Sequence, residues 1–164
     1  MAEKKTTLSE LIENGKTITY SLKPGKSEIY LRAYLLGYGL AMLCLQRGLL
    51  AIHCSALVIG EKAYLVSGES GSGKSTLTGN LLKETDTFFL ADDMTIVYKD
   101  ADGIVYVEPA FPYQKLCRDA ALSQGHALHE LIYVDEDKDK FLVPCKEQFF
   151  PKRAPLGGML YLYP

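Results

Sequence analysis

The segment GESGSGKST, residues 68–76, carries the densest group of side chains in this chain that could do chemistry. It fits the spacing G-x-x-x-x-G-K-[ST], in which glycines let successive backbone N–H groups converge on phosphate oxygens. In such a loop the lysine reaches the β- and γ-phosphates of a nucleotide, and the next hydroxyl binds Mg²⁺. We therefore expect a phosphate-binding loop, called the phosphate loop below, rather than a flexible connection. Its residues are Gly68, Glu69, Ser70, Gly71, Ser72, Gly73, Lys74, Ser75 and Thr76.

A second candidate group is the carboxylate pair Asp92 and Asp93, which ends the apolar run TFFLADD after the phosphate loop. One carboxylate there would meet a nucleotide-bound magnesium ion, and the other could accept a proton from an attacking hydroxyl. The alternative is an acidic strand end that only begins a turn.

His53 is the third candidate, and a hairpin connects it to the phosphate loop. The β-rich runs LLAIHCSALVI and KAYLVSG are separated only by Gly60 and Glu61, which is typical of a two-residue hairpin turn. If Ile59 pairs with Lys62, the antiparallel register puts His53 opposite Gly68. A lone histidine in an apolar strand is more often a core residue, but this register favours a role at the phosphate site.

The surrounding elements must position these residues. A strand before the phosphate loop and a short helix over residues 75–83 give the expected strand-loop-helix context. DADG between MTIVYK and GIVYVEP predicts a second hairpin, and a helix is expected from about residue 28 to 46. AFPYQKL is expected to be an ordered loop. We place no domain boundary and expect one α/β domain over residues 1–164, with a mixed, hairpin-rich sheet and flanking helices around the phosphate loop.

Composition narrows the classes of function. The net charge is −2 and no stripe of Lys or Arg occurs, which argues against a nucleic-acid partner. Four scattered cysteines predict free thiols in a reducing cytoplasm. The apolar run at residues 33–45 is shorter than the roughly 18 residues needed to cross a bilayer, so we expect a buried helix and no membrane association. The apolar end GGMLYLYP predicts a strand at the last residues, as in a chain truncated there or completed by another chain.

A histidine 15 positions before the first glycine of a GxSGxGKS loop, followed by an ADD strand end, resembles the catalytic domain of HPr kinase/phosphorylase and its smaller serine-kinase relatives. These share a core with ATP-dependent phosphoenolpyruvate carboxykinase. The resemblance covers residues 47–97, and more weakly EPAFPYQKL and PKRAPLGGMLYLY.

The resemblance implies a serine kinase with ATP and Mg²⁺ as cofactors. It makes Ser75 and Asp93 magnesium ligands, Asp92 the general base, and His53 a support for the base or the phosphate. Lys74, which the loop motif places on the phosphates, is a further catalytic residue. The implied partner is a small protein or peptide carrying an acceptor serine, and a homo-oligomer is a further expectation.

The chain departs from the family at Met94, where arginine often follows the paired aspartates, and it lacks the downstream glycine- and arginine-containing signature. HPr as the substrate and phosphorylase activity therefore stay open. Two other functions also stay open: an ATPase or GTPase switch with water as acceptor, and a non-catalytic nucleotide-binding module within a peptide-modification or sensing complex. No NKxD motif is present to read guanine.

Overall fold

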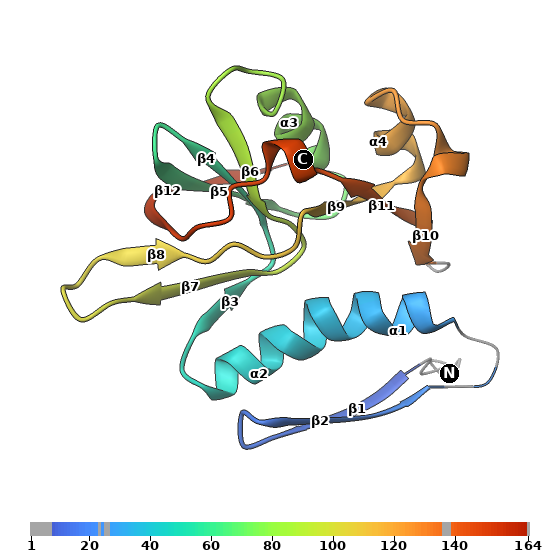
Figure 1. Cartoon of the computed structure of the whole chain (residues 1–164), viewed down its shortest axis with the longest axis vertical. Coiled ribbons are helices and arrows are strands. Elements are labelled where there is room, and N and C mark those ends of the chain that lie inside the picture. The colour runs from blue at the N-terminus through green and yellow to red at the C-terminus, as the bar shows by residue number, and fades with distance from the viewer. Residues whose placement is uncertain (1–7, 23, 25–26, 136–138, 164) are drawn as a thin grey trace.

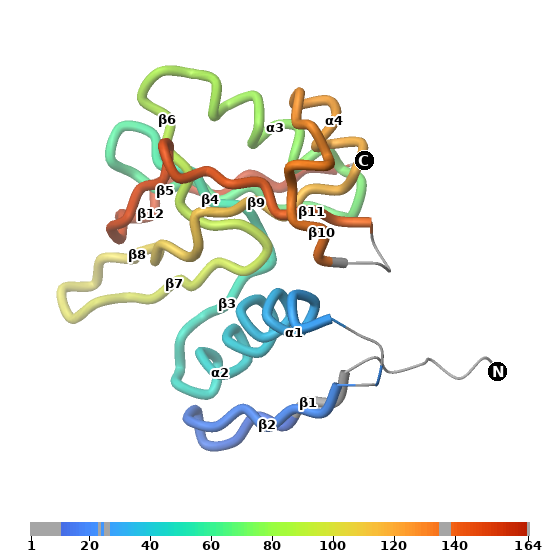
Figure 2. The backbone as a smooth tube through the Cα atoms, turned by 45° about the vertical axis from the view of Figure 1, so that its right-hand side comes forward, coloured from blue at the N-terminus to red at the C-terminus, as the bar shows by residue number. Residues whose placement is uncertain are grey.

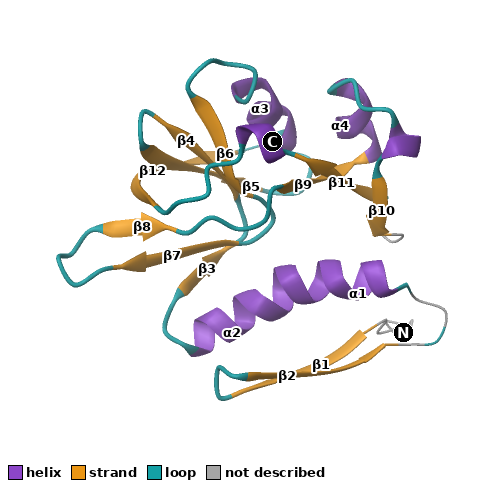
Figure 3. Ribbon diagram, in the orientation of Figure 1, coloured by secondary structure: helices purple, strands orange, loops and turns teal. Residues whose placement is uncertain are grey.

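The computed structural model describes residues 8–22, 24, 27–135 and 139–163 of the chain. The described residues form three sheets and short helices (Figures 1 and 3). The strands are β1 (Leu8–Glu13), β2 (Thr17–Leu22), β3 (Leu50–Ile52), β4 (Ser55–Ile59), β5 (Lys62–Gly68), β6 (Thr87–Ala91), β7 (Thr95–Lys99), β8 (Val105–Val107), β9 (Tyr113–Cys117), β10 (Ile132–Asp135), β11 (Lys140–Pro144) and β12 (Ala154–Leu162). The helices are α1 (Glu28–Tyr34), α2 (Leu40–Gln46), α3 (Lys74–Leu81) and α4 (Arg118–Ser123), with a π-helical turn (Leu35–Gly39) and 3₁₀ turns (Leu128–Glu130 and Lys146–Gln148).

The largest sheet has the strand order β3-β7-β8-β12-β5-β4-β6. Among its described strand pairs, β12–β5 is parallel and the others are antiparallel. This mixed sheet confirms the predicted α/β class and its hairpins β4–β5 and β7–β8. The β10-β11-β9 sheet is separate. The segment AFPYQKL was expected to be an ordered loop, but only residues 110–112 lie outside a strand, and the rest of it belongs to β9.

The β4–β5 register is the predicted one. Ile59 pairs with Lys62 and Ser55 with Val66, across a turn whose residues Gly60 and Glu61 have φ of +54° and +66°. Positive φ at both central residues is the geometry of a type I′ hairpin, whose twist matches the strands it joins. The ladder ends at Ser55, so His53 lies just beyond it, near the end of β5.

The core lies on both faces of strand β4, which pairs with β5 and β6, because successive side chains of a strand point to opposite faces. Ala56 and Val58 pack with Leu65, Leu90 and other residues in one cluster, while Leu57 packs with Phe89 and Leu82 in a second. Fully burying each large apolar side chain is worth about 1.5–3 kcal/mol. This packing fixes the ends of β5 and β6, where the candidate site residues begin.

The helix over residues 28–46 was predicted, but its exposure was not. Ser27 caps α1 by accepting the Tyr30 N–H at 3.1 Å, and the helix continues through the π-helical turn into α2. By length and composition it could cross a membrane, since Glu28–Gln46 has a mean hydropathy of 1.3, and only 22% of that window is buried. The prediction of a buried helix was therefore wrong: its large apolar side chains are mostly on the surface.

This long helix lies between the β1–β2 hairpin and the rest of the chain (Figure 1). The hairpin is fastened to the end of α2, where the Gln46 amide donates to the Ile12 carbonyl at 2.8 Å and Arg47 Nε to the Gly15 carbonyl at 2.6 Å. In both Figure 1 and Figure 2, β9 lies between α3 on one side and α1 on the other. Residues on β9 are thus placed between the phosphate loop's helix and the N-terminal helix.

Candidate functional site

The phosphate loop connects β5 to α3, as the sequence predicted. The Lys74 ammonium donates to the carbonyls of Gly68 and Glu69 at 2.8 and 2.7 Å, so its positive charge lies within the loop. Gly68 has φ of +150°, and a Cβ there would lie 2.5 Å from the Leu162 carbonyl oxygen, so the loop begins in tight contact with the end of β12. The Ser72 hydroxyl is buried and makes no hydrogen bond with any described residue.

Helix α3 is held by the amide of Gln124, just after α4. Its Nε2 donates to the Ser75 carbonyl at 3.2 Å, and the same side chain packs against Gly79, where any Cβ would overlap it. A glycine is required at position 79 for this close approach. The first turn of α3, which bears Ser75, is thereby fixed to α4.

Asp92 follows β6 and is held by two donors on different elements. Ser55 Oγ, at the start of β4, donates to Oδ1 at 2.5 Å, and the Lys115 main-chain N–H of β9 donates to Oδ2 at 2.8 Å. Burial raises the pKa of Asp92 above its ordinary value, and the Asp93 charge adds to this against the lowering effect of both hydrogen bonds. Asp92 therefore holds a proton more readily than a free carboxyl does.

Asp93 is the next residue, but its pKa is shifted in the opposite direction. Burial alone would raise its pKa, but the hydrogen bond from His53 and the charge and hydrogen bond of Lys115 outweigh that effect and hold the pKa well below its usual range. Lys115 Nζ lies 2.7 Å from Oδ2 and His53 Nε2 lies 3.5 Å from Oδ1. Asp93 is therefore expected to be ionised at neutral pH.

His53 links this pair to the phosphate loop. Its main-chain carbonyl accepts the Ser67 hydroxyl at 3.3 Å, one residue before Gly68, while its ring approaches Asp93. The imidazole is 64% exposed, so it is not the core histidine of the alternative interpretation. The hairpin register thus placed His53 correctly near the loop.

A cavity of about 330 Å³ opens onto both carboxylates, and we call it the carboxylate cavity. One wall comes from α1 and the π-helical turn, and the others come from β9, β10, β11 and the segment before β9. Its lining residues are Ile29, Arg32, Ala33, Leu36, Gly37, Asp92, Asp93, Met94, Ala110, Phe111, Tyr113, Lys115, Ile132 and Leu142.

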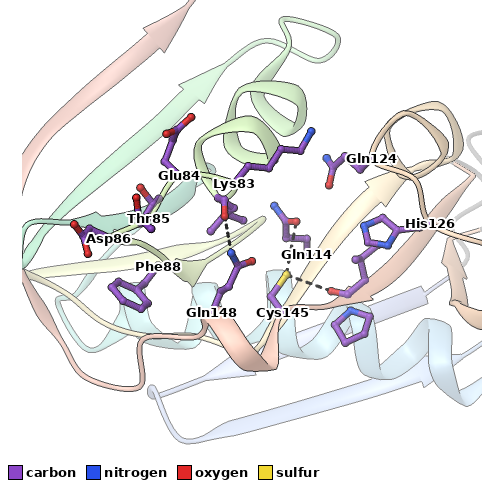
Figure 4. Close-up of a pocket in the computed structure, with 15 residues that line it drawn as sticks. Lys83, Glu84, Thr85, Asp86, Phe88, Gln114, Gln124, His126, Cys145 and Gln148 are labelled. Atoms are coloured by element: carbon purple, nitrogen blue, oxygen red, sulfur yellow. Dashed lines mark hydrogen bonds between the residues drawn. The ribbon is translucent and has the colours of Figure 1, made fainter.

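A second, larger cavity of about 520 Å³ lies beside the C-terminal half of α3 (Figure 4). Three glutamines border it: Gln114 of β9, Gln124 after α4, and Gln148, whose amide donates to the Leu82 carbonyl at 2.5 Å. Cys145 approaches the Gln114 side-chain oxygen at 3.7 Å. No residue of the phosphate loop or of the carboxylate pair lines this cavity, so it is distinct from the candidate site.

The structure brings some of the predicted site residues together and leaves others unconnected. His53 and Asp93 are in contact, and Asp92 shares Lys115 with Asp93. Within the described residues, no hydrogen bond joins Ser75 to either aspartate. Sequence reasoning missed Ser55 and Lys115; the only signal for Lys115 is a lone charged residue within the segment YQKLC.

The donors available for a metal ion are oxygens, from the Ser75 hydroxyl and the carboxylate pair. Oxygen donors fit Mg²⁺, which takes one or two protein oxygens and completes its shell with phosphate and water. Among the described residues, no group of three or more His, Cys, Asp or Glu side chains could hold a metal ion without such added ligands.

Comparison with known proteins gives a distant similarity of fold. No family model matches the chain, and neither does any curated protein sequence. Among solved structures, the chain is similar to the Hpr(Ser) kinase/phosphatase from Coxiella burnetii, with a TM-score of 0.44 and 14% sequence identity over 68% of this chain. The chain spans 58% of the length of that structure. The similarity is one of backbone arrangement and carries nothing about substrate or activity.

Proposed function

We propose that this chain binds ATP in the phosphate loop and transfers the γ-phosphate to a serine hydroxyl of a small protein or peptide. The observation that carries the proposal is the pair Asp92 and Asp93, whose surroundings push their pKa values in opposite directions beside a loop of phosphate-binding composition. Neighbouring carboxyls separated in this way are typical of sites that need one base and one permanent charge.

The nucleotide phosphates would contact the backbone N–H groups of the phosphate loop and the N-terminus of α3, whose dipole favours an anion. Lys74 would exchange its bonds to the Gly68 and Glu69 carbonyls for phosphate oxygens. The buried Ser72 hydroxyl, which has no partner among the described residues, supports a loop that rearranges when its ligand arrives.

Asp92 is the proposed general base. In the transfer step the serine oxygen forms a bond to the γ-phosphorus, the bond from that phosphorus to the ADP oxygen breaks, and the serine proton moves to Asp92. A raised pKa suits this role, because a base works best when its pKa approaches the working pH.

Asp93 is the proposed partner of cations. With Ser75 it would hold Mg²⁺, which when bound would neutralise charge on the phosphate oxygens. Lys115 already provides one positive charge beside Asp93, and this ammonium could instead stabilise the charge that develops on the transferred phosphoryl group. His53 orients Asp93 through its ring.

The arrangement of elements supports this assignment. Helix α3 and helix α1 lie on opposite sides of β9, whose Lys115 contacts both carboxylates (Figure 1). A nucleotide at α3 and an acceptor at the α1 side would place the leaving and attacking oxygens on opposite sides of the γ-phosphorus, as an in-line displacement requires.

One observation favours a second candidate, a nucleotide-binding module without catalysis. Both oxygens of Asp92 already accept hydrogen bonds from the chain itself, and Lys115 occupies Oδ2 of Asp93. In such a module the two carboxylates would hold β4, β6 and β9 together and take no part in phosphoryl transfer.

The purified chain, γ-labelled ATP and Mg²⁺, incubated with a cell lysate from its own source, would separate the candidates. Label on a protein or peptide, lost with Lys74→Ala, supports the kinase. Label released as free phosphate identifies an ATPase, and ATP that is bound but left intact identifies the module. A Lys83→Ala variant, altered just beyond α3, is the matched control and should behave like the wild type.

A further inference from the structure

The carboxylate cavity combines two chemistries that a site for the acceptor needs. Asp92 and Asp93 lie on one side of it, and apolar side chains from four different segments form much of the rest. Any hydroxyl that reaches Asp92 through this cavity must place its neighbouring atoms against those apolar walls.

The apolar walls are unusually open to solvent. Ile29 and Leu36 from the N-terminal helix, Phe111 before β9 and Ile132 of β10 are each between 41% and 49% exposed. Large apolar side chains gathered around one hollow, and left in contact with water, are typical of a surface that a ligand covers. The cavity volume is at the small end of the range for ligand pockets, which suits one side chain and not a nucleotide.

The N-terminal helix approaches the carboxylate of Asp93 at its π-helical turn. Gly37 belongs to the π-helical turn, and a Cβ on it would lie 3.3 Å from Asp93 Oδ2. Single π-helical turns within α-helices occur frequently at functional sites. Here the turn lets the helix backbone approach the carboxylate while Leu36 lines the cavity.

We infer that the carboxylate cavity binds a large aliphatic or aromatic side chain adjacent to the acceptor serine, so that the substrate is an apolar segment of a protein or peptide. This inference rests on the proposed kinase function and adds the substrate class. Among the described residues, the cations that line the cavity are Arg32 and Lys115, and its acidic residues are the aspartate pair. Lys115 is already paired with Asp93, and Arg32 with Glu28. A lysine or arginine beside the serine is therefore disfavoured, because its charge would leave water without gaining an unpaired carboxylate at Asp93.

The test uses peptides that contain one serine. In each peptide, one of the three positions before or after that serine carries Leu, Phe, Asn or Lys. Label transfer from γ-labelled ATP is measured with the wild type and with Leu36→Asp. Leu45→Asp is the matched control, because Leu45 is on the same helix, is 42% exposed, and does not line the cavity. Phe111→Asn tests the opposite wall, and circular dichroism checks that each variant is folded.

We expect Leu or Phe at one position to raise transfer at least about tenfold over Asn, which is the scale of burying one such side chain. Leu36→Asp and Phe111→Asn should remove that preference, and Leu45→Asp should keep it. Phosphoryl transfer that shows no preference for apolar peptides would overturn the inference. A preference that is unchanged in both Leu36→Asp and Phe111→Asn would also overturn it. Either result would still be consistent with the proposed kinase function.

A peptide-binding measurement distinguishes the inferred substrate class from the proposed kinase function. Fluorescence anisotropy of the same peptides is measured with a non-hydrolysable ATP analogue and Mg²⁺. Preferential binding of apolar peptides without any transfer supports the cavity and contradicts the kinase. Neither binding preference nor transfer contradicts both.

Discussion

The Lys115 ammonium lies 2.7 Å from Asp93 Oδ2, and the main-chain N–H of the same residue donates to Asp92 Oδ2 at 2.8 Å. One residue of β9 thus holds both carboxylates, one with its side chain and the other with its backbone. A side-chain substitution can remove the first contact and leave the second, which makes the two functions of Lys115 separable.

Lys115→Met should therefore lower phosphoryl transfer at saturating ATP by about tenfold or more, the scale lost when a group that stabilises developing charge is removed. Asp92 keeps its backbone donor, so the fold around it should persist. Rates are compared by label transfer, with Lys152→Met as an exposed-lysine control. Equal rates for Lys115→Met and wild type would exclude a role for this ammonium in the reaction.

Asp93→Asn should destabilise the chain at neutral pH. The folded pKa of Asp93 lies below the ordinary 3.8, so its ion pairs stabilise the fold above about pH 4 and this stability is lost as the pH falls through the folded pKa. Urea unfolding should show a loss of about 1–3 kcal/mol at about pH 7 that shrinks below about pH 4. Asparagine tolerates the φ of +69° at this position, so backbone strain should not contribute. A loss independent of pH would contradict the ion pairs.

Asp92→Asn should show the opposite pH dependence. Because the folded pKa of Asp92 lies above 3.8, the folded state binds the proton more tightly, and ionisation costs stability as the pH rises from about 4 through the folded pKa. An asparagine cannot ionise, yet it can still accept from Lys115 N–H and donate to Ser55 Oγ. The variant should thus gain stability relative to wild type as the pH rises, and a relative loss at higher pH would show that the ionised carboxylate stabilises the fold.

Gly68→Ala should cost more stability than Gly73→Ala. Both positions have positive φ, +150° and +88°, but a Cβ at Gly68 would meet the Leu162 carbonyl at 2.5 Å, while nothing lies within 4 Å of one at Gly73. Strain alone is worth about 1–2 kcal/mol, and the clash at Gly68 adds displacement of β12. Thermal unfolding of both variants measures the difference, and equal midpoints would contradict the packing of β12 on the phosphate loop.

Gly79→Ala and Gln124→Ala should be coupled. A methyl group at position 79 would push the flexible Gln124 amide aside and break its hydrogen bond to the Ser75 carbonyl, so each single variant should lose about 0.5–1.5 kcal/mol. The double variant should lose no more than either single variant, because both changes remove the same hydrogen bond. A double-mutant cycle by urea unfolding measures the coupling, and additive effects would show that α4 does not hold α3 through this contact.

Local rules predicted the parts of the fold that local interactions decide. The two-residue turn at Gly60 and Glu61 fixes the strand register, and that register is enough to predict His53 near the phosphate loop. The strand-loop-helix around Lys74 followed from glycine spacing. The acidic strand end at Asp92 and Asp93 followed from an apolar run that stops at two charges.

What sequence reasoning missed depends on contacts between distant segments. Lys115 reaches the carboxylates from another sheet, more than twenty residues along the chain, and no local pattern sets that approach. The parallel pairing of β12 with β5 is likewise non-local. The apolar helix was predicted to be buried because hydrophobic residues usually are, but its partners cover only part of it, and that exposed surface contributes Leu36 to the carboxylate cavity.

The most direct test of the proposed kinase function compares ATP binding and phosphoryl transfer in Asp92→Asn and in the wild type. Calorimetry measures ATP affinity with Mg²⁺, and mass spectrometry measures phosphoserine in the acceptor. We predict unchanged affinity with phosphoserine formation reduced by about 10²-fold or more, the contribution typical of a general base. Phosphoserine formed at the wild-type rate by Asp92→Asn would contradict the assignment of Asp92 as the base.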